Sequence, residues 1–448
     1  MPGRAVHRAV TNTPLRQAVS GRMLFVFILG DVLGAGIYAL VGEIAGEVGG
    51  AIWLPMLVAL LMALLTAASY AELVTKYPRA GGAAVFAQQA YGKPLVSFLV
   101  GFSMLAAGVT SAAGLALAFS GDYLGVFLDV PAVPAAVVFL LLVGLLNARG
   151  ITESLRANLV MTVVEVSGLV VVIALAGLVL SRGDGVPSRV LEFTDETTPT
   201  LAVLGAALLA FYSFVGFETS ANIAEEVEDV RRVYPRALLG AVTAAGVVYV
   251  LVGLAVSTVV PADKLSESTG PLLEVVAAAD AGIPPWVFSL VALVAVANGA
   301  LLTMIMASRL TFGMARDGLL PGALAKVLPG RKTPWTAIVA TTVVAMVLCT
   351  TGSVAALAET VVLLLLFVFV STNVAVLVLR RDRADTDHFR TPTALPVLAL
   401  ITCAVLLTQQ SAATWLRAGL LLAVGVALYV VGTVLTRKTT TEQRSTSR

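Results

Sequence analysis

Hydrophobic residues gather into long runs along this chain, and short polar stretches separate one run from the next. A helix that spans a lipid bilayer needs about 20 mainly apolar residues. About twelve runs meet or approach that length, so the pattern predicts an all-α polytopic membrane protein. The predicted spans are 23–46, 51–75, 95–121, 131–148, 158–181, 200–223, 238–260, 286–312, 335–351, 355–379, 394–409 and 413–435. The ninth and tenth runs merge and the eleventh is short, which leaves these three the least sharply defined.

The composition supports the same conclusion. Of the 448 residues, 58% are hydrophobic and 12% are charged, whereas a soluble domain has about 45–50% apolar and about 25% charged residues. So few charges could not cover a protein surface in water, and a lipid bilayer must therefore surround much of the chain. The net charge of +2 gives no reason to expect nucleic acid as a partner.

The positions of lysine and arginine predict how the chain crosses the membrane, because basic residues in short loops mark the cytoplasmic side. If the N-terminus is cytoplasmic, nearly all basic residues fall in inner segments, and the exceptions are Arg182, Arg189, Lys264, Arg417 and the intramembrane Arg309. We therefore expect a multi-pass protein of the cell membrane with both ends cytoplasmic. The expected parts are a tail at 1–22, one membrane domain at 23–436 and a second tail at 437–448.

Two spans depart from the uniform apolar pattern. The first contains Gly-Asp-Val-Leu-Gly-Ala-Gly-Ile-Tyr at 30–38, and the sixth contains Phe-Tyr-Ser-Phe-Val-Gly-Phe-Glu-Thr-Ser at 211–220. Interrupted helices at matching positions of two halves are the best sequence pointer to the binding site of a transporter. Since an odd number of spans per repeat inverts the second copy, we expect inverted repeats at 23–181 and 200–379, with two further helices at 394–435.

The chemistry of an interrupted helix explains why such segments bind ligands. Where a helix unwinds inside the bilayer, its freed N–H and C=O groups need partners from a protein-lined cavity or from a ligand. Amide groups at the start of the second half-helix suit a carboxylate, and exposed carbonyl groups on the adjoining half suit an ammonium group. The alternative is that glycines such as Gly30 and Gly34 only allow close packing between helices.

Four groups of residues resemble the signatures of the amino acid–polyamine–organocation superfamily, and they occur in the order of that family. They are Gly-Ala-Gly-Ile-Tyr at 34–38; Tyr-Ala-Glu-Leu at 70–73 with Tyr-Pro-Arg-Ala-Gly-Gly at 77–82; Phe-Val-Gly-Phe-Glu at 214–218 with Ala-Glu-Glu-Val at 224–227 and Tyr-Pro-Arg-Ala at 234–237; and Ala-Ser-Arg at 307–309 with Met-Ala-Arg-Asp-Gly-Leu-Leu-Pro at 314–321 and Thr-Pro at 333–334. The resemblance covers about the first three-quarters of the chain.

This resemblance implies the leucine-transporter fold of five plus five inverted helices, and alternating access for an amino acid or related amine. It implies that amides around Gly34, Ala35 and Gly36 bind a substrate carboxylate. Carbonyl groups near Val32 and at 211–214 would bind the amine, and Tyr212 would act as an aromatic gate. The full set expected at the substrate site is Asp31, Val32, Gly34, Ala35, Gly36, Ile37, Phe211, Tyr212, Ser213, Phe214 and Gly216.

Ionisable residues inside a membrane are costly and are functional hypotheses by default. Asp31 precedes the first interruption by about one turn, where it could pair with an ammonium group, take up a proton, or anchor broken backbone by hydrogen bonds. Glu165 lies in the middle of the fifth span. Since a carboxyl group removed from water holds a proton more readily, Glu165 could carry the driving proton, or it could simply pair with a neighbouring span.

Three further charged residues have weaker assignments. We expect Glu218 to be a gate or network residue rather than a direct ligand, and Glu72 to support a gate or a loop contact near the cytoplasmic end. Arg309 is expected to be structural, either paired with a carboxylate or reaching toward the membrane surface. Direct contact between Arg309 and the substrate is the alternative.

These features predict a secondary transporter that imports an amino acid or related amine, with a proton as the coupling ion. The alternatives are an amine or polyamine carrier, a gradient-free exchanger, and a nutrient sensor that kept the fold without transport. A Gly-Lys-Ser/Thr phosphate-binding loop is missing from the sequence, so ATP is not the expected driver. We expect no catalytic residue, metal or cofactor, because the chain has only two cysteines, Cys349 and Cys403, and two histidines, His7 and His388.

Overall fold

A computed structural model describes residues 19–79, 81–149, 154–195, 197–329, 331, 333–382 and 387–446, with the side chains of 154–158 and 433–446 left aside. The predicted tail at 1–22 therefore lies largely outside the described residues, as do the last two residues of the tail at 437–448. The described part consists of helices, and its only β-type pairings are isolated bridges such as the one between Gly49 and Phe193.

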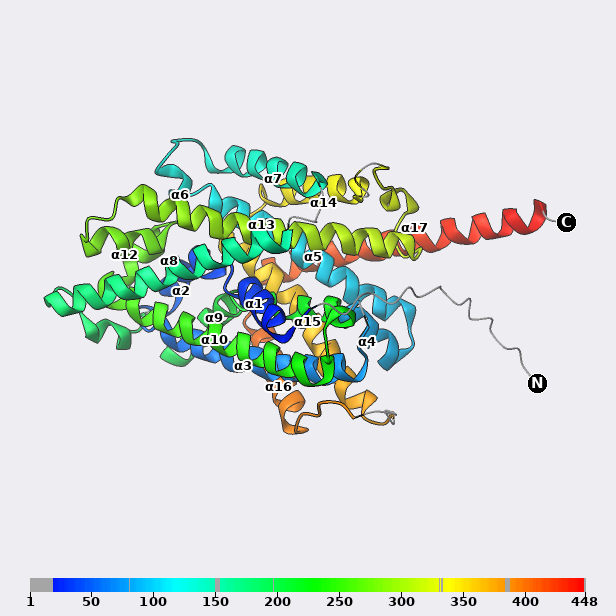
Figure 1. The fold of residues 1–448 in the computed structure, drawn as a ribbon, viewed down its shortest axis with the longest axis horizontal. Coiled ribbons are helices and arrows are strands. Elements are labelled where there is room, and N and C mark those ends of the chain that lie inside the picture. Colours follow the sequence, from blue (N-terminus) through cyan, green and yellow to red (C-terminus); the bar gives the residue numbers. More distant parts are fainter. Residues whose placement is uncertain are drawn as a thin grey trace.

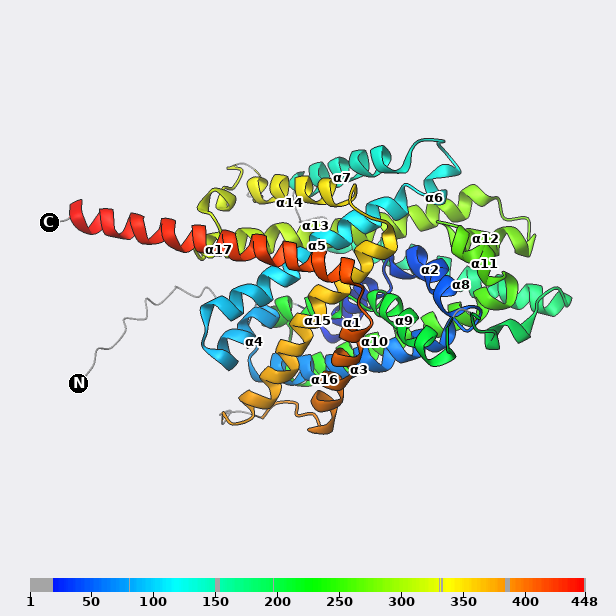
Figure 2. The same ribbon diagram turned by 180° about the vertical axis from the view of Figure 1, so that it is seen from behind.

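Most helices run along one long axis and form a single bundle (Figures 1 and 2). The α-helices are α1 Gly21–Val32, α2 Gly36–Val48, α3 Trp53–Lys76, α4 Gly82–Tyr91, α5 Pro94–Phe119, α6 Asp122–Gly125, α7 Ala132–Arg149, α8 Ser154–Arg182, α9 Pro199–Tyr212, α10 Val230–Val259, α11 Ala262–Glu267, α12 Pro271–Ala279, α13 Pro285–Arg316, α14 Trp335–Leu348, α15 Val354–Leu379, α16 Ala394–Thr408 and α17 Ala412–Thr446. Three short 3₁₀ helices are η1 Pro187–Leu191, η2 Phe217–Glu226 and η3 Gly322–Ala325.

Each of the twelve predicted spans coincides with a helix or a broken helix. Among the described residues, nine helices are long and apolar enough to cross a membrane, and the broken pair α1 and α2 makes ten. The helices α14 and α16, at the predicted ninth and eleventh spans, have 14 and 15 residues. They are shorter than the roughly 20 residues that a straight crossing needs, so the count of twelve stays a prediction.

Some predicted boundaries are wrong. The helix α10 begins at Val230, eight residues before the predicted start at 238, and the predicted boundary missed these turns because they are polar. Pro235 lies near this N-terminal end, where the amide that proline lacks disturbs few helical bonds. At the other end of the chain, α17 continues to Thr446, past the predicted end of the span at 435.

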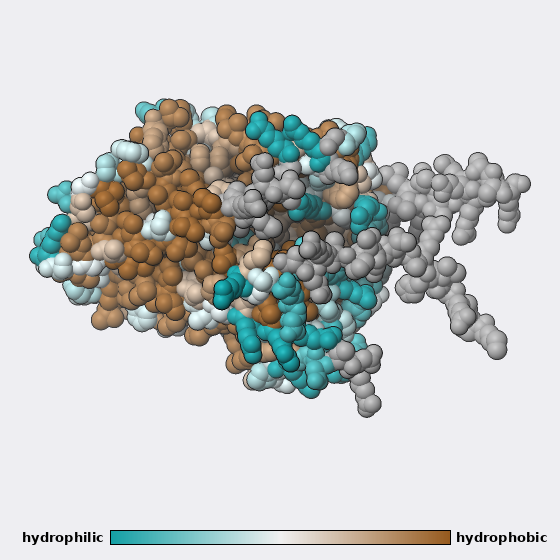
Figure 3. All heavy atoms as spheres, viewed as in Figure 1, coloured by the Kyte–Doolittle hydropathy of each residue, from teal (hydrophilic) through white to brown (hydrophobic). Residues whose placement is uncertain are grey.

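The outer surface of the bundle is apolar, as expected for a protein in lipid. Large exposed side chains such as Leu142 on α7, Val347 on α14 and Leu416 on α17 face outward. Figure 3 shows that brown, apolar atoms cover most of the visible face, while polar atoms gather toward the end from which α17 extends. The lipid bilayer supplies the partner that these side chains lack within the protein.

The interior of the bundle contains the two interrupted helices. The helices α3, α5, α8, α10, α13 and α15 pack around them and against one another. Close packing depends on small residues: Gly108 of α5 approaches the carbonyl oxygen of Thr303 in α13, and Gly114 approaches the backbone of α15 at Val354. Small residues let membrane helices approach closely, and this packing holds the interrupted segments in place.

Candidate functional site

Both predicted interruptions are confirmed. The first span breaks between Val32 and Gly36, and its two halves meet at an angle of 42°. In the sixth span, α9 ends at Tyr212 and the 3₁₀ helix η2 begins at Phe217. The turn between them requires glycine, because Gly216 has a φ of 128°, which L side chains rarely adopt.

The two interruptions touch each other in the middle of the bundle. A Cβ atom on Gly36 would lie 2.8 Å from the Cα atom of Ser213, and a Cβ atom on Gly216 would lie 2.8 Å from the carbonyl oxygen of Asp31. These distances are too short for a side chain, so both glycines are needed for the contact. Segments that are about 180 residues apart in the chain therefore form one buried site.

The amide groups of the first interruption are suited to bind an anion. Among the described residues, no acceptor takes a hydrogen bond from the backbone N–H of Gly34, Ala35, Gly36 or Ile37. These four amides open the half-helix α2, where the helix dipole adds positive potential. Buried amides of this kind cost free energy unless they find a partner, and a carboxylate is the group that such a helix start favours.

The carbonyl groups of the two interruptions converge on one side chain that the sequence analysis missed. Tyr249 of α10 donates from its hydroxyl to the carbonyl oxygen of Val32 and lies 3.1 Å from the carbonyl oxygen of Ser213. The carbonyl oxygens of Phe211 and Tyr212 instead accept from amides of the turn, each at 3.0 Å. A tyrosine in the middle of an apolar span was the available signal, because a buried tyrosine hydroxyl needs a partner.

Asp31 is held by the sixth span. The hydroxyl of Thr219 donates to its carboxylate, and Gly216 packs against its backbone and side chain. The side chain of Asp31 is only partly buried, unlike its neighbours in the interruption. This geometry matches the anchoring role that the sequence analysis left open beside the amine-binding and proton-binding roles.

Glu218 and Tyr212 also make polar contacts inside the bundle. The buried carboxylate of Glu218 accepts from the amide of Gly216 at 3.0 Å and so closes the turn of the sixth span. The hydroxyl of Tyr212 lies 2.8 Å from that of Ser111 in α5. Phe214 packs edge-on against the ring of Tyr249, with centroids 5.2 Å apart.

Glu165 lies in α8 beside the first interruption. Its side chain is fully buried, and its carboxyl oxygens make no hydrogen bond of ordinary geometry with the described residues. The amide side chain of Asn298 in α13 is the polar group next to it. The backbone carbonyl of Glu165 accepts from the hydroxyl of Tyr38 at 2.6 Å, which connects α8 to α2.

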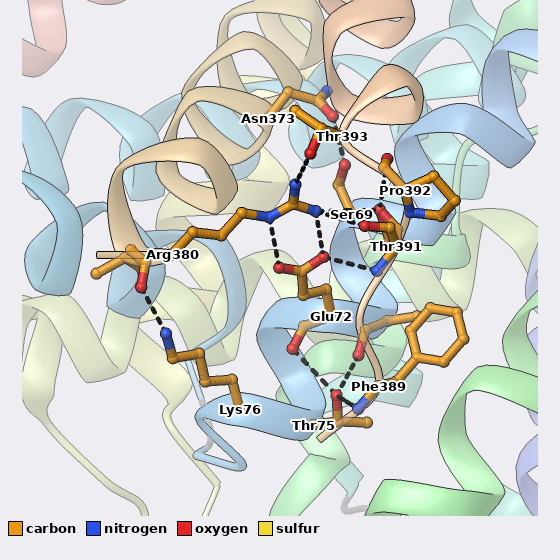
Figure 4. Close-up of polar contacts among 12 residues, drawn as sticks. Ser69, Glu72, Thr75, Lys76, Asn373, Arg380, Phe389, Thr391, Pro392 and Thr393 are labelled. Carbon is orange, nitrogen blue, oxygen red and sulfur yellow. Dashed lines mark hydrogen bonds and ion pairs between the residues drawn. The ribbon is translucent and has the colours of Figure 1, made fainter. Parts of the chain in front are cut away.

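Glu72 lies near the C-terminal end of α3, in a separate network (Figure 4). It is 2% exposed and forms an ion pair with Arg380 at 2.7 Å, and its carboxylate also accepts from the amide of Thr391 at 2.9 Å. Arg380 donates in addition to the carbonyl of Thr391 and the hydroxyl of Thr393. The bond to Thr391 agrees with a loop contact for Glu72, whose role as gate or loop support stays a prediction, and the sequence analysis missed Arg380.

Arg309 has an exposed side chain on α13 and forms no ion pair within 4.0 Å among the described residues. Glu226 of η2 is close enough to interact with it electrostatically, and the two structural interpretations of Arg309 stay predictions. Across the described residues, no group of three or more His, Cys, Asp or Glu side chains could hold a metal ion.

Comparison with known proteins shows which family the sequence resembles. The sequence model of a family described as amino acid permease matches residues 20–436. A branched-chain amino acid permease of Bacillus subtilis is 27% identical, with 90% of each chain covered. A methylthioribose transporter of the same organism is 26% identical over 93% of each chain. The vacuolar cationic amino acid transporter 4 of Arabidopsis thaliana is 29% identical over 87% of this chain and 70% of its own.

Proposed function

The chain belongs to the amino acid permease family, and on that premise we propose that it carries an amino acid across the cell membrane by alternating access. The observation that supports this proposal is the row of four buried amides at 34–37 that make no hydrogen bond with the described residues, in a segment that packs against Ser213 of the second interruption. Amides suit the carboxylate of an amino acid, and carbonyl oxygens suit its ammonium group. A zwitterion is thus recognised by backbone at both ends.

The likeness to known proteins is compatible with this substrate class. The relatives include a branched-chain amino acid permease and a cationic amino acid transporter, although a methylthioribose transporter is also among them. If the backbone binds the two charged ends, the other residues around the site contact the side chain of the substrate and decide which amino acid fits. Because Thr219 already donates to Asp31, we assign Asp31 to anchoring the two interruptions, and a neutral amino acid becomes the preferred substrate.

We further propose that Glu165 carries the coupling proton. Its carboxyl group is fully buried and has no cationic partner among the described residues, so the charged form would be strongly disfavoured in this position. Its backbone bond to Tyr38 and its neighbour Asn298 place it against α2 and α13. A proton bound here from one side and released to the other would couple the gradient to the movement of the first span.

Gating belongs to the same proposal. Tyr212 ends α9 directly at the sixth-span interruption and is fixed by Ser111 of α5, so rotation of its ring would open or close the site. The Glu72–Arg380 pair would hold the cytoplasmic side of α3 against α15. Both chain ends are proposed to be cytoplasmic, and the parts at 23–181, 200–379 and 394–435 are proposed as two inverted repeats and an addition.

The experiment compares ligands that differ at one end only. The melting temperature of purified protein in detergent is measured with leucine and with two analogues. Leucine methyl ester lacks the free carboxylate, and 4-methylpentanoate lacks the amine. A ligand that binds the folded state raises the apparent melting temperature by mass action. We expect leucine, but neither analogue, to raise the melting temperature; if another amino acid is the substrate, it should do so more than its own ester and deaminated analogue. The amino acid that stabilises the protein should then be taken up into proteoliposomes.

Stabilisation by the ester and by simple amines, with none by free amino acids, would contradict the proposal and favour an amine or polyamine carrier. Binding of an amino acid without uptake or exchange would favour the sensor instead. Equal uptake at every external pH would remove the proton from the mechanism and leave a gradient-free exchanger.

A further inference from the structure

One tyrosine hydroxyl connects the two interrupted helices. Tyr249 is fully buried in α10, and its hydroxyl lies at the carbonyl of Val32, the last residue of α1, and 3.1 Å from the carbonyl of Ser213, the residue after α9. A tyrosine hydroxyl has a single proton to donate. Two backbone carbonyls, one from each interruption, therefore share one donor.

The helix that carries Tyr249 is suited to fix both segments. The helix α10 is continuous over 30 residues and packs along α1 and α3, whereas the segments at 33–35 and 213–216 lie outside the helices and are closed only by single turns. The ring of Phe214 packs edge-on against Tyr249, which limits how the phenol can turn. Gly36 provides a second contact between the interruptions, because it packs so closely on Ser213 that an added Cβ atom would lie 2.8 Å from the Cα atom of Ser213.

We propose that Tyr249 is a positioning residue that couples the two interruptions, so that movement at one is transmitted to the other through the shared hydroxyl. The proposal rests on the proposed function for its role in transport. The free amides belong to the first interruption, and Ser213 belongs to the second. Tyr249 thereby sets the distance between the part of the site that suits a carboxylate and the part that suits an ammonium group.

A second buried tyrosine on the same helix provides a matched control. Tyr234 is also fully buried in α10, and its hydroxyl lies 2.7 Å from that of Ser220 in η2. Its contact involves the sixth span alone. Tyr234→Phe and Tyr249→Phe therefore each remove one buried hydroxyl group from α10. They differ in that only Tyr249→Phe takes a hydrogen bond from the first interruption.

The test is hydrogen–deuterium exchange of the intact protein in detergent, without ligand. The amides at 34–37 make no hydrogen bond with the part of the chain that the structure describes, so they exchange whenever water reaches them. For Tyr249→Phe we expect exchange to become about threefold to tenfold faster in peptides that cover 30–38 and 211–218, the factor that corresponds to one net hydrogen bond. Tyr234→Phe should leave 30–38 unchanged, and peptides from α5 should match the parent protein in both variants.

An unchanged 30–38 peptide in Tyr249→Phe, or the same acceleration there in Tyr234→Phe, would overturn the coupling role. In proteoliposomes we expect Tyr249→Phe to lower Vmax/KM about tenfold and Tyr234→Phe to lower it less than about threefold. Faster exchange with unchanged uptake would refute the role in transport. If the parent protein takes up no amino acid, the proposed function fails, while the exchange result still decides whether Tyr249 couples the interruptions.

Discussion

The buried ion pair between Glu72 and Arg380 offers a perturbation whose size can be worked from the structure. The two residues are separated by 308 positions in the chain and join α3 to α15. Two parallel bonds of 2.9 and 2.7 Å connect the guanidinium to the carboxylate. The side chain of Glu72 is 2% exposed and that of Arg380 is 12% exposed.

Removing one partner leaves the other charge buried and unpaired, which costs about 3–5 kcal/mol. For Glu72→Leu the amide of Thr391 also loses its acceptor, which adds about 1–3 kcal/mol. For Arg380→Met that amide keeps its bond to Glu72, but the carbonyl of Thr391 and the hydroxyl of Thr393 each lose a donor. Because Arg380 retains some access to water, the charge left unpaired by Glu72→Leu should cost free energy at the lower end of the range of about 3–5 kcal/mol, and the more deeply buried Glu72 left by Arg380→Met should cost more.

The double variant should be much less unstable than the sum of the two single variants. Replacing both partners by apolar residues leaves no buried charge, and such replacements are often neutral or stabilising. The amide and the carbonyl of Thr391 remain unbonded, at about 1–3 kcal/mol each, while the exposed hydroxyl of Thr393 can bond to water. The interaction energy of this double-mutant cycle should therefore exceed about 2 kcal/mol.

The assay is the apparent melting temperature of purified protein in one detergent, with the folded fraction followed by size-exclusion chromatography. An exposed pair of the same length supplies the control: Lys264 and Glu274 are 2.7 Å apart, with side chains 57% and 27% exposed. Such a pair contributes about 0–1 kcal/mol. If Glu72→Leu lowers the melting temperature no more than Glu274→Leu, or if the two single losses simply add, the reasoning about the buried pair is wrong.

Three further predictions test the site. Asp31→Asn should reduce uptake of neutral and cationic amino acids to the same degree if Asp31 anchors Thr219, and a selective loss of cationic substrates, measured by competition for uptake, would restore its role as an amine ligand. Glu165→Gln should abolish accumulation driven by a pH gradient but spare counterflow exchange in proteoliposomes, and intact proton-driven uptake would exclude Glu165 as the proton carrier. Gly216→Ala should cost about 1–3 kcal/mol from its left-handed backbone, with overlap against Asp31 added. Gly92→Ala, at a φ of 61° and with no atom within 4 Å of the new Cβ, should show the backbone cost alone when melting temperatures are compared.

The sequence by itself determined which segments form long apolar helices and where two of these helices break. Both are local properties. A run of apolar residues indicates by its own composition that lipid surrounds it, and glycine beside a carboxylate within such a run indicates that the helix is interrupted there. Residue type alone thus indicated the segments at 30–38 and 211–220. It indicated less for α14 and α16, because an apolar run of borderline length can cross the bilayer by several routes.

Only the tertiary structure decided which polar groups meet. The sequence indicated that Glu72 and Asp31 need partners, but only the structure shows that these are Arg380 and Thr219, from distant parts of the chain. It likewise places Asn298 of α13 next to Glu165. The sequence around Tyr249 gave almost no indication of its hydrogen bonds, because a single tyrosine in an apolar helix is equally compatible with ordinary side-chain packing. The physical reason is that a buried polar group must be satisfied, whereas the sequence specifies neither the distance nor the direction of the helix that satisfies it.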